Sequence, residues 1–121
     1  GSPDRVRGCA PDPRRLAALT IGGRTVRGVG ITAHDGDDRI VSRAFYPAYG
    51  VDEDPVTGSL HTLLAPWWCA RLGVATLRAT QGGRRTGTLS CTWDGGADVV
   101  LSGGAHTYLQ GTVALPTDDA P

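Results

Sequence analysis

The chain has 121 residues, and its 12 basic residues, all arginine, balance 12 acidic residues to a formal net charge of zero. Nucleic acids and anionic membrane surfaces are bound through clusters of basic residues, so a balanced chain without such a cluster excludes both as expected partners. The sequence has neither an apolar run of about 18 residues that could span a bilayer nor a leader with a basic start and an apolar centre. We therefore expect a cytoplasmic protein.

The cysteines indicate no metal site and no disulfide framework. Cys9, Cys69 and Cys91 are odd in number and widely spaced, without a C-x-x-C pair. We expect them to be reduced thiols, with no bound metal. The chain also has no nucleotide-binding glycine pattern after a strand and no lysine for a Schiff base, so we expect no cofactor.

This length corresponds to a single domain near the lower end of the common size range. We expect an N-terminal extension over residues 1–11, with Gly1 and Ser2 as a candidate tag remnant, a domain over residues 12–115, and a flexible tail over residues 116–121.

The first half of the domain predicts a short helix followed by two strands. Asp12 and Pro13 provide an N-cap and a first helical residue, which predicts a helix up to residue 19. Residues 25–33 predict a strand interrupted by glycines, and a turn over residues 35–38 leads to a second strand. This second strand, residues 39–46, is indicated by alternation of its apolar residues between two faces.

An acidic tight loop over residues 51–59 then leads into an apolar segment, residues 60–72, that predicts a helix. Thr57 is the predicted N-cap. The helix is apolar nearly all round, which predicts burial on most sides. Pro66 predicts a kink, and Gly73 marks the end.

The rest of the chain predicts an antiparallel meander. Four short segments rich in Thr, Val, Leu or aromatic residues are separated by glycine-containing turns. They cover residues 75–81, 86–94, 98–102 and 105–115. Strands before and after one apolar helix predict an α+β fold, with a sheet curled around one central buried helix.

The acidic loop is also the candidate functional site. The first amides of a helix lack intrahelical partners, and the helix dipole adds positive charge there, so a carboxylate or phosphate could bind at Gly58, Ser59 and Leu60. Asp54 lies beside this end and could serve as an acid or base. A simple helix cap followed by a solvated turn is the alternative.

Several motifs occur together in one order. They are RAFYP at 43–47 with Gly50, EDPVTGS at 53–59, LAPWW at 64–68, RLG at 71–73, Gln81 with Arg85, VLSG at 100–103 and a closing Gly111. This set resembles the second half of the PhzF-like isomerases of phenazine biosynthesis, which have the diaminopimelate-epimerase-like fold. The resemblance implies that the sheet around the central buried helix is mixed and, with the predicted meander, mostly antiparallel. The similarity runs from about Leu16 to Leu115, so the resemblance implies a PhzF-like second domain over residues 12–115.

The resemblance implies roles for individual residues. The carboxylate at the position of Asp54 lies in the active site, where it holds the substrate or manages its proton, and the hydroxyl at the position of Ser59 contacts substrate. We therefore predict Asp54 as catalytic and Thr57, Gly58, Ser59 and Leu60 as substrate-binding residues.

Two further residues complete the predicted site. His61 lies one helical step inside it and is predicted as a proton carrier, the alternative being a histidine that only makes hydrogen bonds within the protein. Arg43 is predicted to reach a substrate carboxylate, as could Arg85, and a salt bridge on the strand explains either arginine equally well.

The resemblance also implies what is missing. The family is built from two such halves, and its principal base, a glutamate, lies in the first. We therefore predict a cofactor-independent isomerase or epimerase acting on a small carboxylated metabolite, with its site completed by a homodimer or by a separate first-half chain. The alternatives are a small-anion-binding subunit without catalysis and an excised domain.

Overall fold

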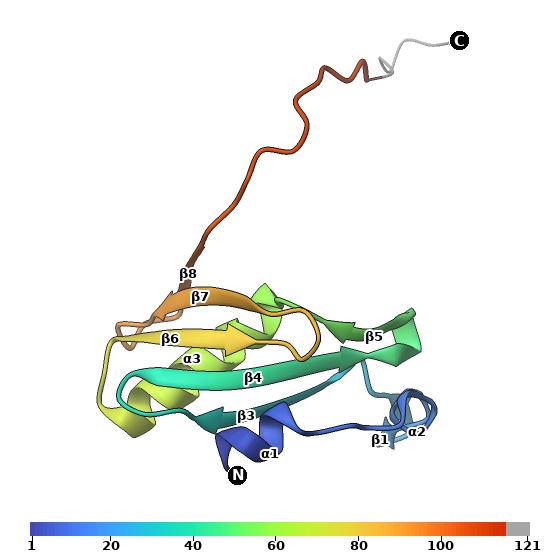
Figure 1. Ribbon diagram of the computed structural model, residues 1–121, viewed down its shortest axis with the longest axis horizontal. Coiled ribbons are helices and arrows are strands. Elements are labelled where there is room, and N and C mark those ends of the chain that lie inside the picture. The colour runs from blue at the N-terminus through green and yellow to red at the C-terminus, as the bar shows by residue number, and fades with distance from the viewer. Residues whose placement is uncertain (116–121) are drawn as a thin grey trace.

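The computed structural model describes residues 1–115, and the predicted tail at residues 116–121 lies outside the described residues. Figure 1 shows the arrangement of the elements. In chain order they are α1 (Pro3–Arg7), α2 (Pro13–Ala17), β1 (Thr20–Ile21), β2 (Arg24–Thr25), β3 (Val29–His34), β4 (Arg39–Tyr46), the 3-10 turn η1 (Pro47–Tyr49), β5 (Val51–Asp54), α3 (Gly58–Leu72), β6 (Thr76–Gln81), β7 (Gly87–Thr92) and β8 (Val100–Gly103).

A six-stranded sheet forms the body of the protein. The strand order is β3-β4-β6-β7-β8, and β5 pairs with the end of β4. β4 and β6 run parallel, and the other pairs in this sheet are antiparallel. A parallel pair needs a crossover connection, and α3 provides it on one face of the sheet (Figure 1). The predicted α+β class with a mixed, mostly antiparallel sheet is confirmed.

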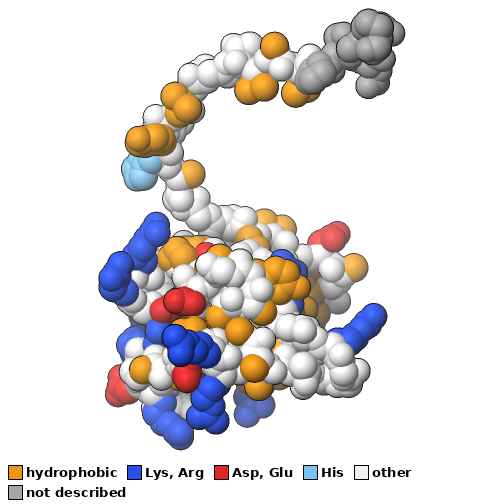
Figure 2. All heavy atoms as spheres, turned by 90° about the vertical axis from the view of Figure 1, so that its right-hand side faces the viewer, with side chains coloured by type: hydrophobic (Ala, Val, Ile, Leu, Met, Phe, Trp, Pro, Cys, Tyr) orange, Lys and Arg blue, Asp and Glu red, His pale blue; other side chains and the backbone are white. Residues whose placement is uncertain are grey.

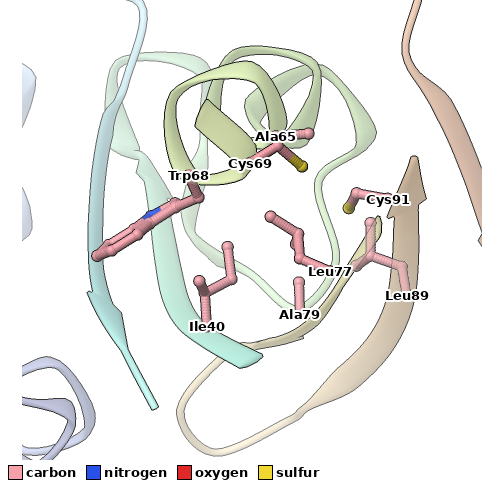
Figure 3. Close-up of a cluster of buried hydrophobic side chains, with 8 residues drawn as sticks. All are labelled: Ile40, Ala65, Trp68, Cys69, Leu77, Ala79, Leu89 and Cys91. Atoms are coloured by element: carbon pink, nitrogen blue, oxygen red, sulfur yellow. The ribbon is translucent and has the colours of Figure 1, made fainter. Parts of the chain in front are cut away.

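The main hydrophobic core lies between α3 and this sheet. In Figure 3, side chains of α3 point toward side chains of the strands below it. The cluster consists of Ile40, Ala65, Trp68, Cys69, Leu77, Ala79, Leu89 and Cys91. Trp68 also satisfies its indole N–H, which donates to Thr32 Oγ1 at 3.1 Å.

The outer side of α3 differs from the prediction of burial on most sides. Leu63 is 73% exposed and Trp67 is 52% exposed, because the described strands cover only the opposite side of the helix. The helix begins at Gly58, continues through Pro66, and ends at Gly73, whose φ of 69° is the left-handed conformation expected of a helix-ending glycine.

The N-terminal segment, predicted as an extension, contains helix α1, which packs on β3 and β4. Val6 is buried there against Ala33 and Val41. The short helix predicted from Asp12 and Pro13 is confirmed as α2, with the Asp12 side chain accepting a hydrogen bond from the Arg14 amide at 2.9 Å.

The strand predicted over residues 105–115 is wrong. This segment follows β8 and extends away from the body without regular structure (Figure 1). Figure 2 shows its hydrophobic side chains standing clear of the body, and Tyr108 is 100% exposed. A strand needs a neighbouring strand for its backbone hydrogen bonds, and within residues 1–115 none lies alongside.

Candidate functional site

Part of the predicted acidic loop is a strand. β5, residues Val51–Asp54, pairs antiparallel with β4, and the register shifts between the pairs at Asp54 and Val51. Such an irregularity changes the direction in which neighbouring side chains point. Asp52 and Glu53 therefore line one small hollow together with Arg84 and Arg85, whereas Asp54 lines a different one.

The hollow beside Asp54 lies at the start of α3 and has a volume of about 540 Å³. It is formed by the end of β4, the turn η1, β5, the loop before α3 and the first residues of α3. The residues that line it are Arg27, Tyr46, Tyr49, Val51, Asp54, Val56, Thr57, Gly58 and Ser59. Of the seven predicted site residues, the structure thus brings Asp54, Thr57, Gly58 and Ser59 together around one space.

Asp54 is held by the residue that precedes the helix. Thr57 Oγ1 donates to Asp54 Oδ2 at 2.6 Å. Thr57 occupies the predicted N-cap position, but its side chain makes no capping hydrogen bond because the hydroxyl is turned toward Asp54. The first amides of α3 therefore remain without a side-chain cap from Thr57, as an anion-binding helix start requires.

Positive charge reaches the hollow from two sources. The start of a helix carries roughly half a positive charge, and Gly58 and Ser59 lie at that end. Arg27 adds its guanidinium from the segment before β3, and no ion pair of Arg27 occurs among residues 1–115. The Leu60 side chain does not line the hollow but lies against Gly30 of β3.

His61 lies behind the hollow rather than in it. The side chain is fully buried, and its Nδ1 donates to the Thr57 carbonyl oxygen at 2.8 Å. Nε2 lies 3.2 Å from Ser42 Oγ, so in the neutral ring it accepts the hydrogen of that hydroxyl. Burial lowers the pKa of His61, which favours this neutral form. Its use as a proton carrier remains a prediction.

Arg43 does not line the hollow, and its side chain makes contacts that hold the fold together. Its Nε and Nη2 donate to the two carboxylate oxygens of Glu53 at 2.7 and 2.8 Å. Nη1 donates to the carbonyl oxygens of Arg7, at 3.1 Å, and of Cys9. The hydrogen bond from Arg43 lowers the pKa of Glu53. The guanidinium thus ties the N-terminal segment to β4 and β5, as the salt-bridge alternative supposed.

Gln81 contributes to the resemblance but was not predicted as a site residue. It is fully buried at the end of β6, and its amide contacts both Asp54 and Thr57. A signal existed: Leu77, Ala79 and Gln81 alternate on the buried side of β6, so a polar side chain stands where an apolar one is expected.

Within residues 1–115, His, Cys, Asp and Glu side chains form no cluster of three that could hold a metal ion. In the same part of the chain, no helix has the length and hydropathy needed to cross a membrane.

Comparison with known proteins places this chain in a family. A sequence profile described as "Phenazine biosynthesis-like protein" (PhzC-PhzF) matches residues 2–112. The chain belongs to this phenazine biosynthesis-like family. The match begins inside the segment that was predicted as an extension, in agreement with the packing of α1 on the sheet.

Two similar relatives from Pseudomonas aeruginosa are each named an uncharacterized isomerase. They are 48% and 43% identical to the chain over 110 and 114 residues, which are 91% and 94% of this chain. The chain spans only 40% and 41% of the length of these relatives.

Two crystal structures share the fold. A PhzC/PhzF protein from Clostridium difficile matches with a TM-score of 0.78 and 35% identity, over 94% of this chain and 42% of that protein. A PhzF-family protein from Enterococcus faecalis matches with a TM-score of 0.70 and 36% identity, over 88% of this chain and 42% of that protein. The predicted resemblance to one half of a PhzF-like protein is confirmed.

Proposed function

We propose that the hollow at the start of α3 binds a small carboxylated metabolite, and that Asp54 transfers a proton on it in a cofactor-independent isomerisation. The observation that carries this proposal is that Asp54 and the first residues of α3, whose amides have no side-chain cap from Thr57, line the same space. The isomerase names of the Pseudomonas relatives support the reaction class.

The lining of the hollow suits a small organic acid. The substrate carboxylate binds at the amides of Gly58 and Ser59, where the helix dipole and Arg27 favour an anion. Tyr46, Val51 and other apolar side chains supply walls for the carbon skeleton. Asp54 then lies at the other side of the bound acid, where a C–H bond next to its carboxylate can be reached.

One carboxylate of the described residues is available for proton transfer at the hollow, whatever the completing surface adds. Asp54 is the only acidic residue from positions 1–115 that lines this hollow. One group can take a proton from a carbon atom and return it to another carbon of the same molecule. In an allylic amino or hydroxy acid, the C–H bond beside the carboxylate breaks, the double bond moves by one position, and the proton returns at the far carbon.

We further propose that a second protein surface completes the site, in a homodimer or with a separate chain that supplies the other half. Apolar residues at the rim support this, since Tyr49, Val51 and Val56 line the hollow and are exposed. Light scattering on a size-exclusion column should give the mass of a dimer. The mass of a monomer would count against the homodimer and direct the search to a partner chain.

The test of the reaction is migration of the double bond. The probes are 2-amino-3-butenoate and 2-hydroxy-3-butenoate, followed by proton NMR. Asp54→Asn should slow this migration at least about 100-fold, the usual size of a general acid–base contribution. Asp52→Asn, on the same strand but outside the hollow, should stay within about twofold of the unchanged chain. Full turnover by Asp54→Asn would refute the proposal.

The same experiment examines the second candidate, a small-anion-binding subunit without catalysis. The uncapped start of α3 favours it, because those amides bind an anion whether or not chemistry follows. Binding of either probe, measured by calorimetry, without migration of the double bond would support this candidate.

A further inference from the structure

Gln81 reaches from the end of β6 to the segment that carries Asp54. Its Nε2 donates to the Asp54 carbonyl oxygen at 2.7 Å and to Thr57 Oγ1 at 2.9 Å. Its Oε1 accepts from the Thr57 amide at 2.9 Å. A primary amide has two N–H donors and one carbonyl oxygen, so these contacts use both donors and the oxygen.

These partners determine which way round the Gln81 amide lies. Exchanging its oxygen and nitrogen would set a carbonyl oxygen against the Asp54 carbonyl and an N–H against the Thr57 amide, and neither pair can form a hydrogen bond. Nε2 therefore faces Thr57 Oγ1, and the hydroxyl oxygen accepts from it.

The direction of the next hydrogen bond follows. The Thr57 hydroxyl has a single hydrogen and lies 2.6 Å from Asp54 Oδ2. With Gln81 already donating to that hydroxyl, its own hydrogen is directed at Oδ2, which must act as an acceptor. A proton on Oδ2 would place two hydrogens between the same two oxygens. The other carboxylate oxygen, Asp54 Oδ1, accepts no hydrogen bond from any group of residues 1–115.

Thr57 is also held through its main chain. His61 Nδ1 donates to the Thr57 carbonyl oxygen, and Ser42 Oγ lies at the other ring nitrogen. The amide, the carbonyl and the hydroxyl of Thr57 therefore all have partners, and Thr57 is buried. A buried side chain with every polar group satisfied has one preferred orientation.

We propose that Gln81 and Thr57 are positioning residues that hold Asp54 with Oδ2 as a permanent acceptor and Oδ1 as the oxygen that exchanges the proton with the substrate. This inference rests on the function proposed above. The proton leaves the carbon beside the substrate carboxylate, binds Oδ1, and returns from Oδ1 to the far carbon of the allylic acid. Oδ2 keeps its hydrogen bond to Thr57 throughout.

The first test needs no turnover. In 15N–1H spectra of the whole chain, both side-chain amide protons of Gln81 should exchange slowly with solvent. Thr57→Val removes the hydroxyl at nearly constant shape and should shift the resonance of one of these two protons strongly, whereas Thr57→Ser should preserve both. Fast exchange of both Gln81 side-chain protons would overturn the proposed orientation. So would a spectrum in which Thr57→Val leaves both resonances unchanged.

The second test separates positioning from folding and from substrate binding. With the allylic probes, Thr57→Val should lower kcat by about tenfold or more and leave KM within about threefold, and Thr57→Ser should restore most of kcat. Thr80→Val, a matched change at an exposed position of β6, should leave both constants unchanged. A Thr57→Ser variant as impaired as Thr57→Val would overturn the role of the hydroxyl.

Failure of this inference is distinguishable from failure of the proposed function. If Asp54→Asn is inactive and Thr57→Val keeps the full kcat, only the positioning role is refuted. If Asp54→Asn keeps full turnover, the proposed function and the inference are refuted together.

Discussion

Arg43 has more charged and polar contacts than a side chain on a strand usually makes. It is only 8% exposed, yet it pairs with Glu53 through two hydrogen bonds and donates to carbonyl oxygens of the N-terminal segment. Burying a charge is costly unless its hydrogen-bonding groups have partners. This single side chain therefore connects α1, β4 and β5, and β5 carries Asp54.

Glu53→Gln should lower the free energy of unfolding by about 2 to 3 kcal/mol at pH 7, because it leaves the buried guanidinium with a neutral partner. The pKa of Glu53 is lowered from its usual 4.5 in the folded protein. Ionised Glu53 therefore stabilises the fold above that pH, and this contribution is lost as the pH falls below about 4.5. The difference in unfolding free energy between Glu53→Gln and the unchanged chain should therefore be smaller at low pH.

Urea unfolding at pH 7 and at pH 4 measures this difference. Asp52→Asn, which changes the exposed neighbour, is the control and should stay within about 0.5 kcal/mol of the unchanged chain at pH 7. Equal stability of Glu53→Gln and the unchanged chain at pH 7 would contradict the argument.

At the scale of elements, α3 has two different sides. One side is packed on the sheet through Ala65, Trp68 and Cys69, as Figure 3 shows. The other side presents Leu63 and Trp67 to solvent. Both sides are apolar in the sequence, so composition alone does not reveal which one the sheet covers.

Two leucine substitutions should reveal this asymmetry. Leu77→Ala removes a fully buried side chain beneath α3 and should cost about 3 kcal/mol of unfolding free energy. Leu63→Ala on the outer side of α3 should cost no more than about 0.5 kcal/mol. Urea titration measures the unfolding free energy of both variants. A similar cost at the two positions would show that α3 is covered on both sides in solution.

Elements with a strong local pattern could be predicted from the sequence, whereas elements that depend on a distant partner could not. The bounds of β4 were predicted correctly because its alternation is strong and local. β5 was missed because Asp52, Glu53 and Pro55 are typical of a turn, and its pairing with β4 is not visible in the local pattern. Residues 105–115 are rich in Thr, Val, Leu and aromatic residues, as strands often are, yet a strand also requires a neighbour.

The candidate site was predictable to a similar degree. The motif at residues 53–59 identified Asp54, Gly58 and Ser59. The contacts of Gln81 depend on β6 lying parallel to β4, 24 residues from Thr57 in the chain, and no local pattern carries that register. Arg43 was assigned to a substrate because its alternative partner, Glu53, becomes apparent only once β5 is seen to pair with β4.

At the scale of the whole molecule, the chain divides into a packed body and an extended segment that follows β8. The segment leaves the body at the edge of the sheet (Figure 1) and exposes Tyr108 and Leu109. Its backbone makes no hydrogen bonds to the body within the described residues.

Brief digestion with chymotrypsin should therefore cut first after Tyr108 or Leu109. Proteases need an unpaired, extended backbone, which this segment offers. Trp67 is also exposed, but it lies within α3, whose backbone is hydrogen-bonded, so it should be cut much later. Mass spectrometry of the first products identifies the site, and early cleavage within α3 would contradict the description of the body.

The parallel pairing of β4 with β6 determines when the candidate site can form during synthesis of the chain. Asp54 and Thr57 lie inside the loop that this pairing closes, and the side chain that orients them belongs to its last pair, Ser42 with Gln81. A growing chain adds residues from the N-terminus, so Asp54 emerges from the ribosome well before Gln81. Until β6 has docked, the start of α3 and the carboxylate beside it are present in the chain but lack their contacts with Gln81.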